Sequence, residues 1–481
     1  MNIENAKYIK HEVDEFNGNP LIEALRNALE PKDFVNELLH KPEFGENVQV
    51  MSGFSRELKV ALIENTYFPM PILYTKYKCI LKNILKGYIH RNPLKRNTKY
   101  FQNQVSTNAN FELPAGVNLS ACISEIGFSG GGKTLGTDKC LSIIPQVIRH
   151  NGYEGQYLKL DQITYLKFEA PNTKTQKGFI LSLFFAVDEV IGTNYFNEWK
   201  QSKDGIQVLL IEAKKIAYNH FIGVVFIDEI QRCVSTKDSI AFADKTTLEF
   251  IDNFFNSIGI PLIVAGTNKV FPLYRTAMST ARRLTKGRMF SQEGIEGTIV
   301  DPEDANEEIE NPVWKQFVNM YHQPNLLAKP FEFDENIRNK LFHYSVGIPA
   351  LFVRLIMLTY EEAIMCDLET INADLIDSVY YDQFEIMHPA LESLREDGNT
   401  TNSTYEDLIR FNGFKKEEPH PVDLLIEQNE KAVKNKRKNE EEDGDFVEVE
   451  PLAQTFQPKH DLRQLFGSDQ DRLAKTFGQK L

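Results

Sequence analysis

The sequence predicts an α/β fold in which helices cover both faces of a parallel sheet. A glycine-rich loop of the form G-x-x-x-x-G-K-T occupies residues 127–134, directly after an apolar run. Between about residues 116 and 302, short β-branched and aromatic runs alternate with longer amphipathic stretches. This alternation is typical of a parallel sheet whose strands are buried on both faces. The expected strands are residues 119–126, 163–169, 222–228, 261–266 and 297–301.

Changes in composition divide the chain of 481 residues into five segments. After the core, residues 334–344, 350–365 and 371–395 have helical apolar spacing. A basic block and then an acidic block follow, with few large apolar residues, so we expect a disordered linker. Spaced apolar residues near the end predict a tethered peptide for a partner, with a frayed tail as the alternative. The expected segments are an N-terminal partner- or DNA-binding region (1–115), the α/β core (116–302), a helical lid subdomain (303–400), the charged linker (401–455) and the tail (456–481).

Composition limits the classes of function. No run of about 18 apolar residues exists, so we expect no transmembrane helix, and the first residues do not resemble a secretory signal. Five scattered cysteines without a C-x-x-C pair favour reduced thiols in the cytoplasm and argue against a zinc site. The net charge of −14 means that binding to nucleic acid requires a local basic patch.

The glycine-rich loop is the clearest functional motif. Its glycines allow backbone N–H groups to surround phosphate oxygens, while a lysine reaches the terminal phosphates and a threonine hydroxyl can bind Mg²⁺. We therefore expect the loop to bind ATP. The expected phosphate-binding residues are Gly127, Phe128, Ser129, Gly130, Gly131, Gly132, Lys133 and Thr134.

An acidic pair strengthens this interpretation. The apolar strand at 222–228 ends in Asp228, and Glu229 follows it. In P-loop ATPases an acidic residue at this position supports Mg²⁺, and a neighbouring Glu can polarise the attacking water. The spacing between Thr134 and Asp228 leaves room for one further strand, 163–169, which we expect to be inserted in the sheet.

Polar and basic residues further along complete the expected site. Thr267, or else Asn268, follows the strand at 261–266 and could lie beside the γ-phosphate, unless these residues form a plain β-turn. Arg282 or Arg283 could reach the nucleotide of a neighbouring subunit, although a solvated face is the alternative. Arg354, on a helix that begins near Pro349, could reach back to the phosphates.

A local basic surface is expected in residues 71–100, which contain eight Lys and Arg residues and no Asp or Glu. Apolar residues at helical spacing predict an amphipathic helix with a cationic face. Such a face could follow the phosphate backbone of DNA without reading sequence, whereas an acidic protein partner or plain solvation are the alternatives. The candidate DNA-binding residues are Lys76, Lys78, Lys82, Lys86, Arg91, Lys95, Arg96 and Lys99.

Together these motifs resemble AAA+ ATPases, and most of the chain resembles TnsC, the family of AAA+ regulators of DNA transposition. The nucleotide motifs at 225–231, 266–267 and 280–283 are common to AAA+ proteins. The segments that point to TnsC are residues 18–25, 90–93, 388–395 and 461–463.

The resemblance implies an ATPase that uses Mg²⁺ and assembles as a ring or helical filament on double-stranded DNA. It further implies that the N-terminal region contacts a target-selection protein and that the tail contacts the transposase. Hydrolysis would then disassemble the complex. The alternatives are a replication initiator or helicase loader, and a nucleotide-switched signalling protein that does not bind DNA.

Overall fold

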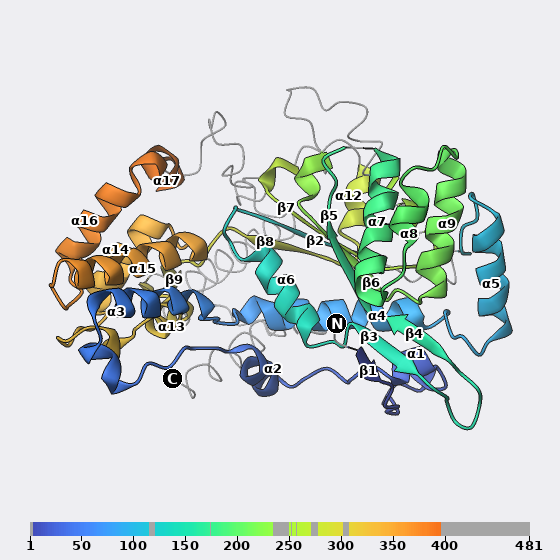
Figure 1. Ribbon diagram of the computed structural model, residues 1–481, viewed down its shortest axis with the longest axis horizontal. Coiled ribbons are helices and arrows are strands. Elements are labelled where there is room, and N and C mark those ends of the chain that lie inside the picture. Colours follow the sequence, from blue (N-terminus) through green and yellow to red (C-terminus); the bar gives the residue numbers. More distant parts are fainter. Residues whose placement is uncertain are drawn as a thin grey trace, which may run out of the picture. The chain divides into compact units, whose positions relative to one another are not determined.

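A computed structural model of the chain describes residues 3–114, 121–173, 175–233, 250–251, 253–255, 257–270, 278–301 and 307–395 (Figure 1). The predicted linker and tail lie outside these residues. Among the described helices, none combines the length and hydrophobicity needed to cross a lipid bilayer.

Five parallel strands form the central sheet, in the order β5-β6-β7-β2-β8. Every residue of β2, β6 and β7 is buried. The predicted α/β class with a parallel sheet is therefore confirmed, because only strands covered on both faces are buried throughout. The strands are β2 (Cys122–Gly127), β5 (Tyr165–Glu169), β6 (Val224–Asp228), β7 (Leu262–Gly266) and β8 (Arg288–Gln292).

Two details of the predicted sheet are wrong. The strand expected at 163–169 belongs to the sheet as β5, but it lies at the edge and is not inserted between other strands; the strand between β6 and β2 is β7. Residues 297–301 do not join this sheet, because β9 (Thr298–Val300) pairs antiparallel with β10 (Glu308–Glu310). The fifth core strand is β8, whose sequence Arg-Met-Phe-Ser-Gln has polar ends and therefore lacks the continuous apolar run used to recognise strands.

Helices flank the central sheet (Figure 1). Helix α7 packs on β5, α4 packs on β6, and α6 and α12 pack on β2. Val224 and Phe226 of β6 share one buried cluster with Ile80 and Ile84 of α4, so the apolar face of α4 is part of the core. The helices of this region are α4 (Pro71–Tyr88), α5 (Arg96–Thr107), α6 (Lys133–Ser142), α7 (Gln176–Ile191), α8 (Tyr195–Trp199), α9 (Ile206–Asn219) and α12 (Met278–Leu284).

A second sheet, which the sequence patterns did not predict, joins the N-terminal region to the core. Its middle strand β3 (Val147–His150) pairs in parallel with β1 (Ile3–Asn5) and antiparallel with β4 (Leu160–Ile163). Two short helices follow β1, α1 (Pro20–Glu23) and α2 (Pro31–Leu38).

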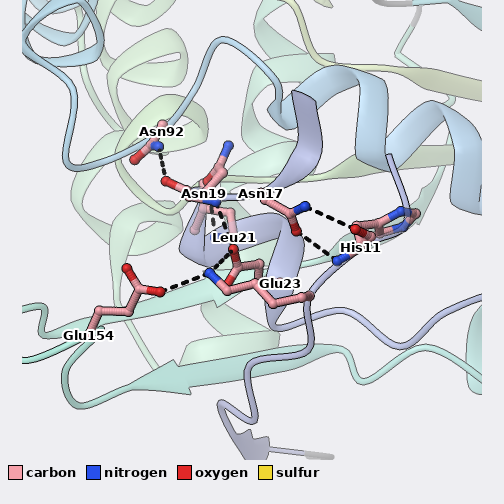
Figure 2. Close-up of polar contacts among 9 residues, drawn as sticks. His11, Asn17, Asn19, Leu21, Glu23, Asn92 and Glu154 are labelled. Carbon is pink, nitrogen blue, oxygen red and sulfur yellow. Dashed lines mark hydrogen bonds and ion pairs between the residues drawn. The ribbon is translucent and has the colours of Figure 1, made fainter. Parts of the chain in front are cut away.

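Polar contacts fix the start of α1 against the end of α4 (Figure 2). The Asn19 side chain accepts a hydrogen bond from the Leu21 N–H as helix cap and donates to the Tyr88 carbonyl at 2.8 Å. The Asn92 amide donates to the Gly18 carbonyl at 2.7 Å. Segments 18–25 and 90–93, two of those that resemble TnsC, are thus neighbours that stabilise the fold.

The region after β10 is helical, as predicted. Helix α16 ends before the chain turns into α17, so the expected helical stretch at 371–395 is two helices. Helix α3 (Gly53–Val60), from the N-terminal region, packs against α15. The helices are α13 (Pro312–Met320), α14 (Glu335–Ser345), α15 (Pro349–Met365), α16 (Ala373–Gln383) and α17 (His388–Arg395).

Candidate nucleotide-binding site

The glycine-rich loop connects the buried strand β2 to helix α6. Gly130 and Gly132 have φ angles of 78° and 86°, a left-handed conformation that favours glycine. A Cβ atom on Gly127 would lie 1.9 Å from the Gln292 carbonyl oxygen of β8, so only glycine fits there. The loop therefore has the tight backbone path that lets N–H groups at the start of α6 face an anion.

Lys133 is folded back onto this loop. Its ammonium group donates to the carbonyl oxygens of Gly127 at 3.0 Å and Phe128 at 2.6 Å. Burial lowers the pKa of Lys133, whereas the carboxylates of Glu125, Asp228 and Glu229 act in the opposite direction. A phosphate group in the loop would supply the compensating negative charge that a buried ammonium lacks here.

Thr134 and Asp228, the predicted metal ligands, lie in direct contact. They lie 94 residues apart in sequence, yet the Thr134 hydroxyl donates to the Asp228 carboxylate at 2.5 Å. The described residues contain no cluster of three or more His, Cys, Asp or Glu side chains suited to a metal. One carboxylate and one hydroxyl nevertheless fit Mg²⁺, which in phosphate sites takes its remaining ligands from phosphates and water.

Glu229 lies next to Asp228, in a conformation unusual for a non-glycine residue. Its φ angle is 55°, and its N–H donates to the Asp228 carboxylate at 2.7 Å. The Gln231 amide donates to the Glu229 carboxylate at 2.6 Å and accepts a hydrogen bond from the Thr267 N–H at 3.1 Å. Gln231 thus links the predicted catalytic residues Glu229 and Thr267. We did not single out Gln231 as a site residue, because only the fold brings β6 and β7 together.

One cavity of about 720 Å³ contains these groups. Its polar end includes Thr267, whose hydroxyl is buried without a hydrogen-bond partner among the described residues, as is the Gln292 side-chain oxygen. Such unpaired oxygens fit a polar ligand or water. Much of the remaining lining is apolar and aromatic, which suits a purine ring, and the sequence patterns did not predict this part. The apolar lining is Tyr67, Phe68, Met70, Leu73, Phe317, Tyr321, Val353, Met357 and Leu358.

The remaining predicted nucleotide contacts occupy different positions. Arg354 lines the cavity, but its guanidinium lies 5.0 Å from the Phe384 ring centroid, at the side of α16. Asn268 is buried directly after Thr267. Arg282 and Arg283 are exposed on α12, and Arg283 donates to the Asn253 side chain at 2.9 Å. Their proposed roles stay predictions.

The structure contradicts two of the candidate DNA-binding residues. Lys76 is 1% exposed and forms an ion pair with Glu125 of β2. Arg91 is also 1% exposed and donates to the carbonyl oxygens of Gly87 and Ile222, both at 2.7 Å. Neither side chain can reach a DNA backbone, because each is enclosed by protein.

The other candidate cations lie at or near the surface. Lys78 is half-buried, and its ammonium lies 4.4 Å from the Tyr74 ring centroid. The exposed members are Lys82 and Lys86 on α4, Lys95, Arg96 and Lys99. Lys82 and Lys86 act together with Arg288 of β8 to lower the pKa of the Cys79 thiol, although burial raises it more. We define the two exposed lysines of α4, Lys82 and Lys86, as the α4 patch.

Comparison with known proteins identifies the segment that holds the loop and the acidic pair. Residues 120–273 match the family model of the AAA domain. This stretch of the chain is therefore similar to AAA domains. The match includes Lys133, Thr134, Asp228, Glu229 and Thr267, and it supports nucleotide binding and ATPase activity as the chemistry of the cavity.

Beyond the AAA domain the comparisons are less informative. A Walker-type ATPase of Pyrococcus abyssi aligns at 11% identity over 63% of this chain and 77% of its own, with a TM-score of 0.31. A chain of the Drosophila ORC bound to DNA aligns at 10% identity over 66% of this chain and 68% of its own, with a TM-score of 0.32. No curated protein sequence matches the chain.

Proposed function

We propose that the chain is an ATPase switch that assembles on double-stranded DNA and regulates transposition in the manner of TnsC. The observation that carries the ATPase part is the Thr134–Asp228 hydrogen bond at 2.5 Å, with Glu229 directly beside it. A hydroxyl, a carboxylate and a neighbouring glutamate at one phosphate loop support Mg²⁺ binding and water activation as the chemistry of this site. Mg²⁺ bound there would neutralise charge on the phosphates, while Glu229 would orient the attacking water.

The DNA part rests on the exposed cations of α4 and of residues 95–99. A chain with a net charge of −14 repels DNA as a whole, so a concentrated basic surface is the only general means of attraction. Nothing in the sequence resembles a base-reading module, which favours sequence-independent binding to the phosphate backbone.

The assembly and partner parts rest on sequence and on exposure. Arg282 and Arg283 are exposed and could complete the nucleotide site of a neighbouring copy in a ring or filament. The TnsC resemblance assigns a target-selection protein to the N-terminal region and a transposase to residues 456–481. On this proposal the chain acts in the cytoplasm and hydrolysis ends the DNA-bound state.

A DNA-binding assay with random duplexes tests the proposal. We expect binding with a non-hydrolysable ATP analogue and Mg²⁺, little binding without nucleotide, and affinity that increases with duplex length. Lys133→Ala should remove nucleotide binding and with it DNA binding. A wild-type chain that hydrolyses ATP but binds no duplex in either state would instead favour the signalling protein without DNA.

A further inference from the structure

A buried ion pair lies behind the phosphate loop. The Lys76 ammonium of α4 contacts the Glu125 carboxylate of β2, and both side chains are 1% exposed. The second oxygen of Glu125 accepts a hydrogen bond from the Thr137 hydroxyl of α6 at 2.6 Å. One carboxylate therefore joins the strand before the loop, the helix after the loop and the N-terminal helix α4.

The packing around this pair leaves little freedom between α4 and α6. A Cβ atom on Gly136 of α6 would lie 2.8 Å from a Leu73 methyl carbon and 3.5 Å from the Lys76 ammonium. The two helices are thus in close contact beside the ion pair. A displacement of α4 must then move Glu125, which is two residues before Gly127 of the loop.

Stability alone does not account for two buried charges at this position. Apolar residues of similar volume often stabilise a protein core as well as a buried ion pair does. The same helix that holds Lys76 inside carries Lys82 and Lys86 on its exposed face. One rigid helix consequently connects a surface for polyanions with the strand that enters the phosphate loop.

We propose that Lys76 is a positioning residue which, through Glu125, couples binding of DNA at the α4 patch to the ATP affinity of the phosphate loop. The inference rests on the proposed function and adds the physical connection between its two sites. Because coupling between two binding sites is reciprocal, DNA must tighten ATP binding by the same factor by which ATP tightens DNA binding.

The test measures the affinity for a fluorescent ATP analogue with Mg²⁺, in the presence and absence of duplex DNA, on the full chain. In the wild type we expect DNA to tighten nucleotide binding by about fivefold or more. The double variant Lys76→Met/Glu125→Met should bind nucleotide nearly as well as the wild type when DNA is absent. The ratio of its nucleotide affinity with DNA to its affinity without DNA should fall to about one.

Single variants separate positioning from general stability. Lys76→Met leaves the Glu125 carboxylate buried and uncompensated near the phosphates, so nucleotide affinity without DNA should fall by about tenfold. Adding Glu125→Met should restore that affinity but not the response to DNA. If Lys76→Met does not fold, the double variant, which carries no buried charge here, still decides the question.

The matched control is Arg338→Met/Glu310→Met, which removes another largely buried ion pair, between α14 and β10, with a contact at 2.7 Å; neither residue lines the nucleotide cavity. This control should keep the wild-type ratio. A ratio that survives in Lys76→Met/Glu125→Met, or that is lost equally in the control, overturns the inference while leaving the proposed function intact. A ratio of one in the wild type contradicts both.

Discussion

Glu229 shows how one residue can be held beside a phosphate loop at a conformational cost. A left-handed φ of 55° is unfavourable for a side chain that is not glycine or asparagine, and such strain often marks functional sites. The Gln231 amide holds the carboxylate of Glu229, and the Asp228 carboxylate accepts its N–H. These contacts give the carboxylate a fixed position beside the metal ligands.

The substitution Glu229→Gln tests this role. It keeps the shape of the side chain but removes the charge that would orient and polarise water. We expect nucleotide binding to persist and the turnover of ATP to fall by a factor of at least about 100. The DNA-bound state should then last longer, and steady-state phosphate release together with DNA dissociation rates measures both effects.

Glu169→Gln provides the matched control for this substitution. Glu169 ends the neighbouring strand β5, where its carboxylate accepts a hydrogen bond from the Arg232 guanidinium at 2.5 Å, and it does not line the nucleotide cavity. The Glu169→Gln variant should turn over ATP at a rate close to that of the wild type. Equal losses in the two variants would refute a specific role for Glu229.

At the scale of the element, α4 has two faces of different character. Its apolar residues and Lys76 face the core, whereas Lys82 and Lys86 are exposed. Helical periodicity in the sequence predicts these two faces but does not reveal that Lys76, one turn before the main apolar run, faces inward. The buried charge of Lys76 is compensated by the carboxylate of Glu125, which belongs to β2 and lies 49 residues away in the sequence.

The double charge reversal Lys82→Glu/Lys86→Glu tests the outer face of α4. We expect weaker duplex binding and a slope of log K against log salt that is reduced by about two, one for each lost phosphate contact. ATP binding without DNA should be unchanged, since neither side chain lines the nucleotide cavity.

Lys200→Glu/Lys203→Glu serves as the control, because these two lysines are also exposed but lie near the end of α8. The control lowers the net charge equally and should change the salt slope much less. If both pairs alter it to the same extent, general repulsion rather than the α4 patch explains the loss.

At the scale of the whole molecule, the N-terminal region and the helical region enclose the apolar end of the nucleotide cavity together. Tyr67 and Phe68 come from the first region, while Phe317 and Tyr321 come from the second. A buried ion pair between Arg56 of α3 and Glu369 connects the two regions at 2.6 Å, with 9% and 11% side-chain exposure. Closure of the cavity thus depends on contacts between distant parts of the chain.

Acid should weaken this connection. The Arg56 hydrogen bonds hold the pKa of Glu369 below its ordinary value of 4.5, although burial acts in the opposite direction. Its contribution to stability is therefore complete above about pH 4.5 and is lost as the pH falls through the lower, folded-state pKa. Glu369→Gln should lower the free energy of unfolding at pH 7 by about 3 kcal/mol, because it leaves Arg56 buried without its partner.

Denaturant unfolding across pH measures this effect. The difference between the wild type and Glu369→Gln should shrink as the pH falls below about 4.5. Glu385→Gln, at an exposed position between α16 and α17, should differ little from the wild type at any pH. A Glu369 variant whose deficit is the same at all pH values would contradict the ion-pair explanation.

Sequence alone was sufficient for the local parts of the site. The loop from Gly127 to Thr134 is contiguous, and its glycines encode the backbone path directly. Asp228 could be assigned because parallel strands end at the same edge of a sheet, which brings residues far apart in sequence together. The α/β class followed from continuous apolar strands.

Only the tertiary structure decided the order of the strands, the burial of Lys76 and Arg91, and the bridge from Glu229 through Gln231 to Thr267. Each of these features depends on which elements become neighbours. A hydrophobic pattern predicts that one face of an element is buried, but it does not identify the element that packs against that face. The sequence does not distinguish a buried cation from an exposed one, because the carboxylate or carbonyl that pairs with the buried cation comes from a distant part of the chain.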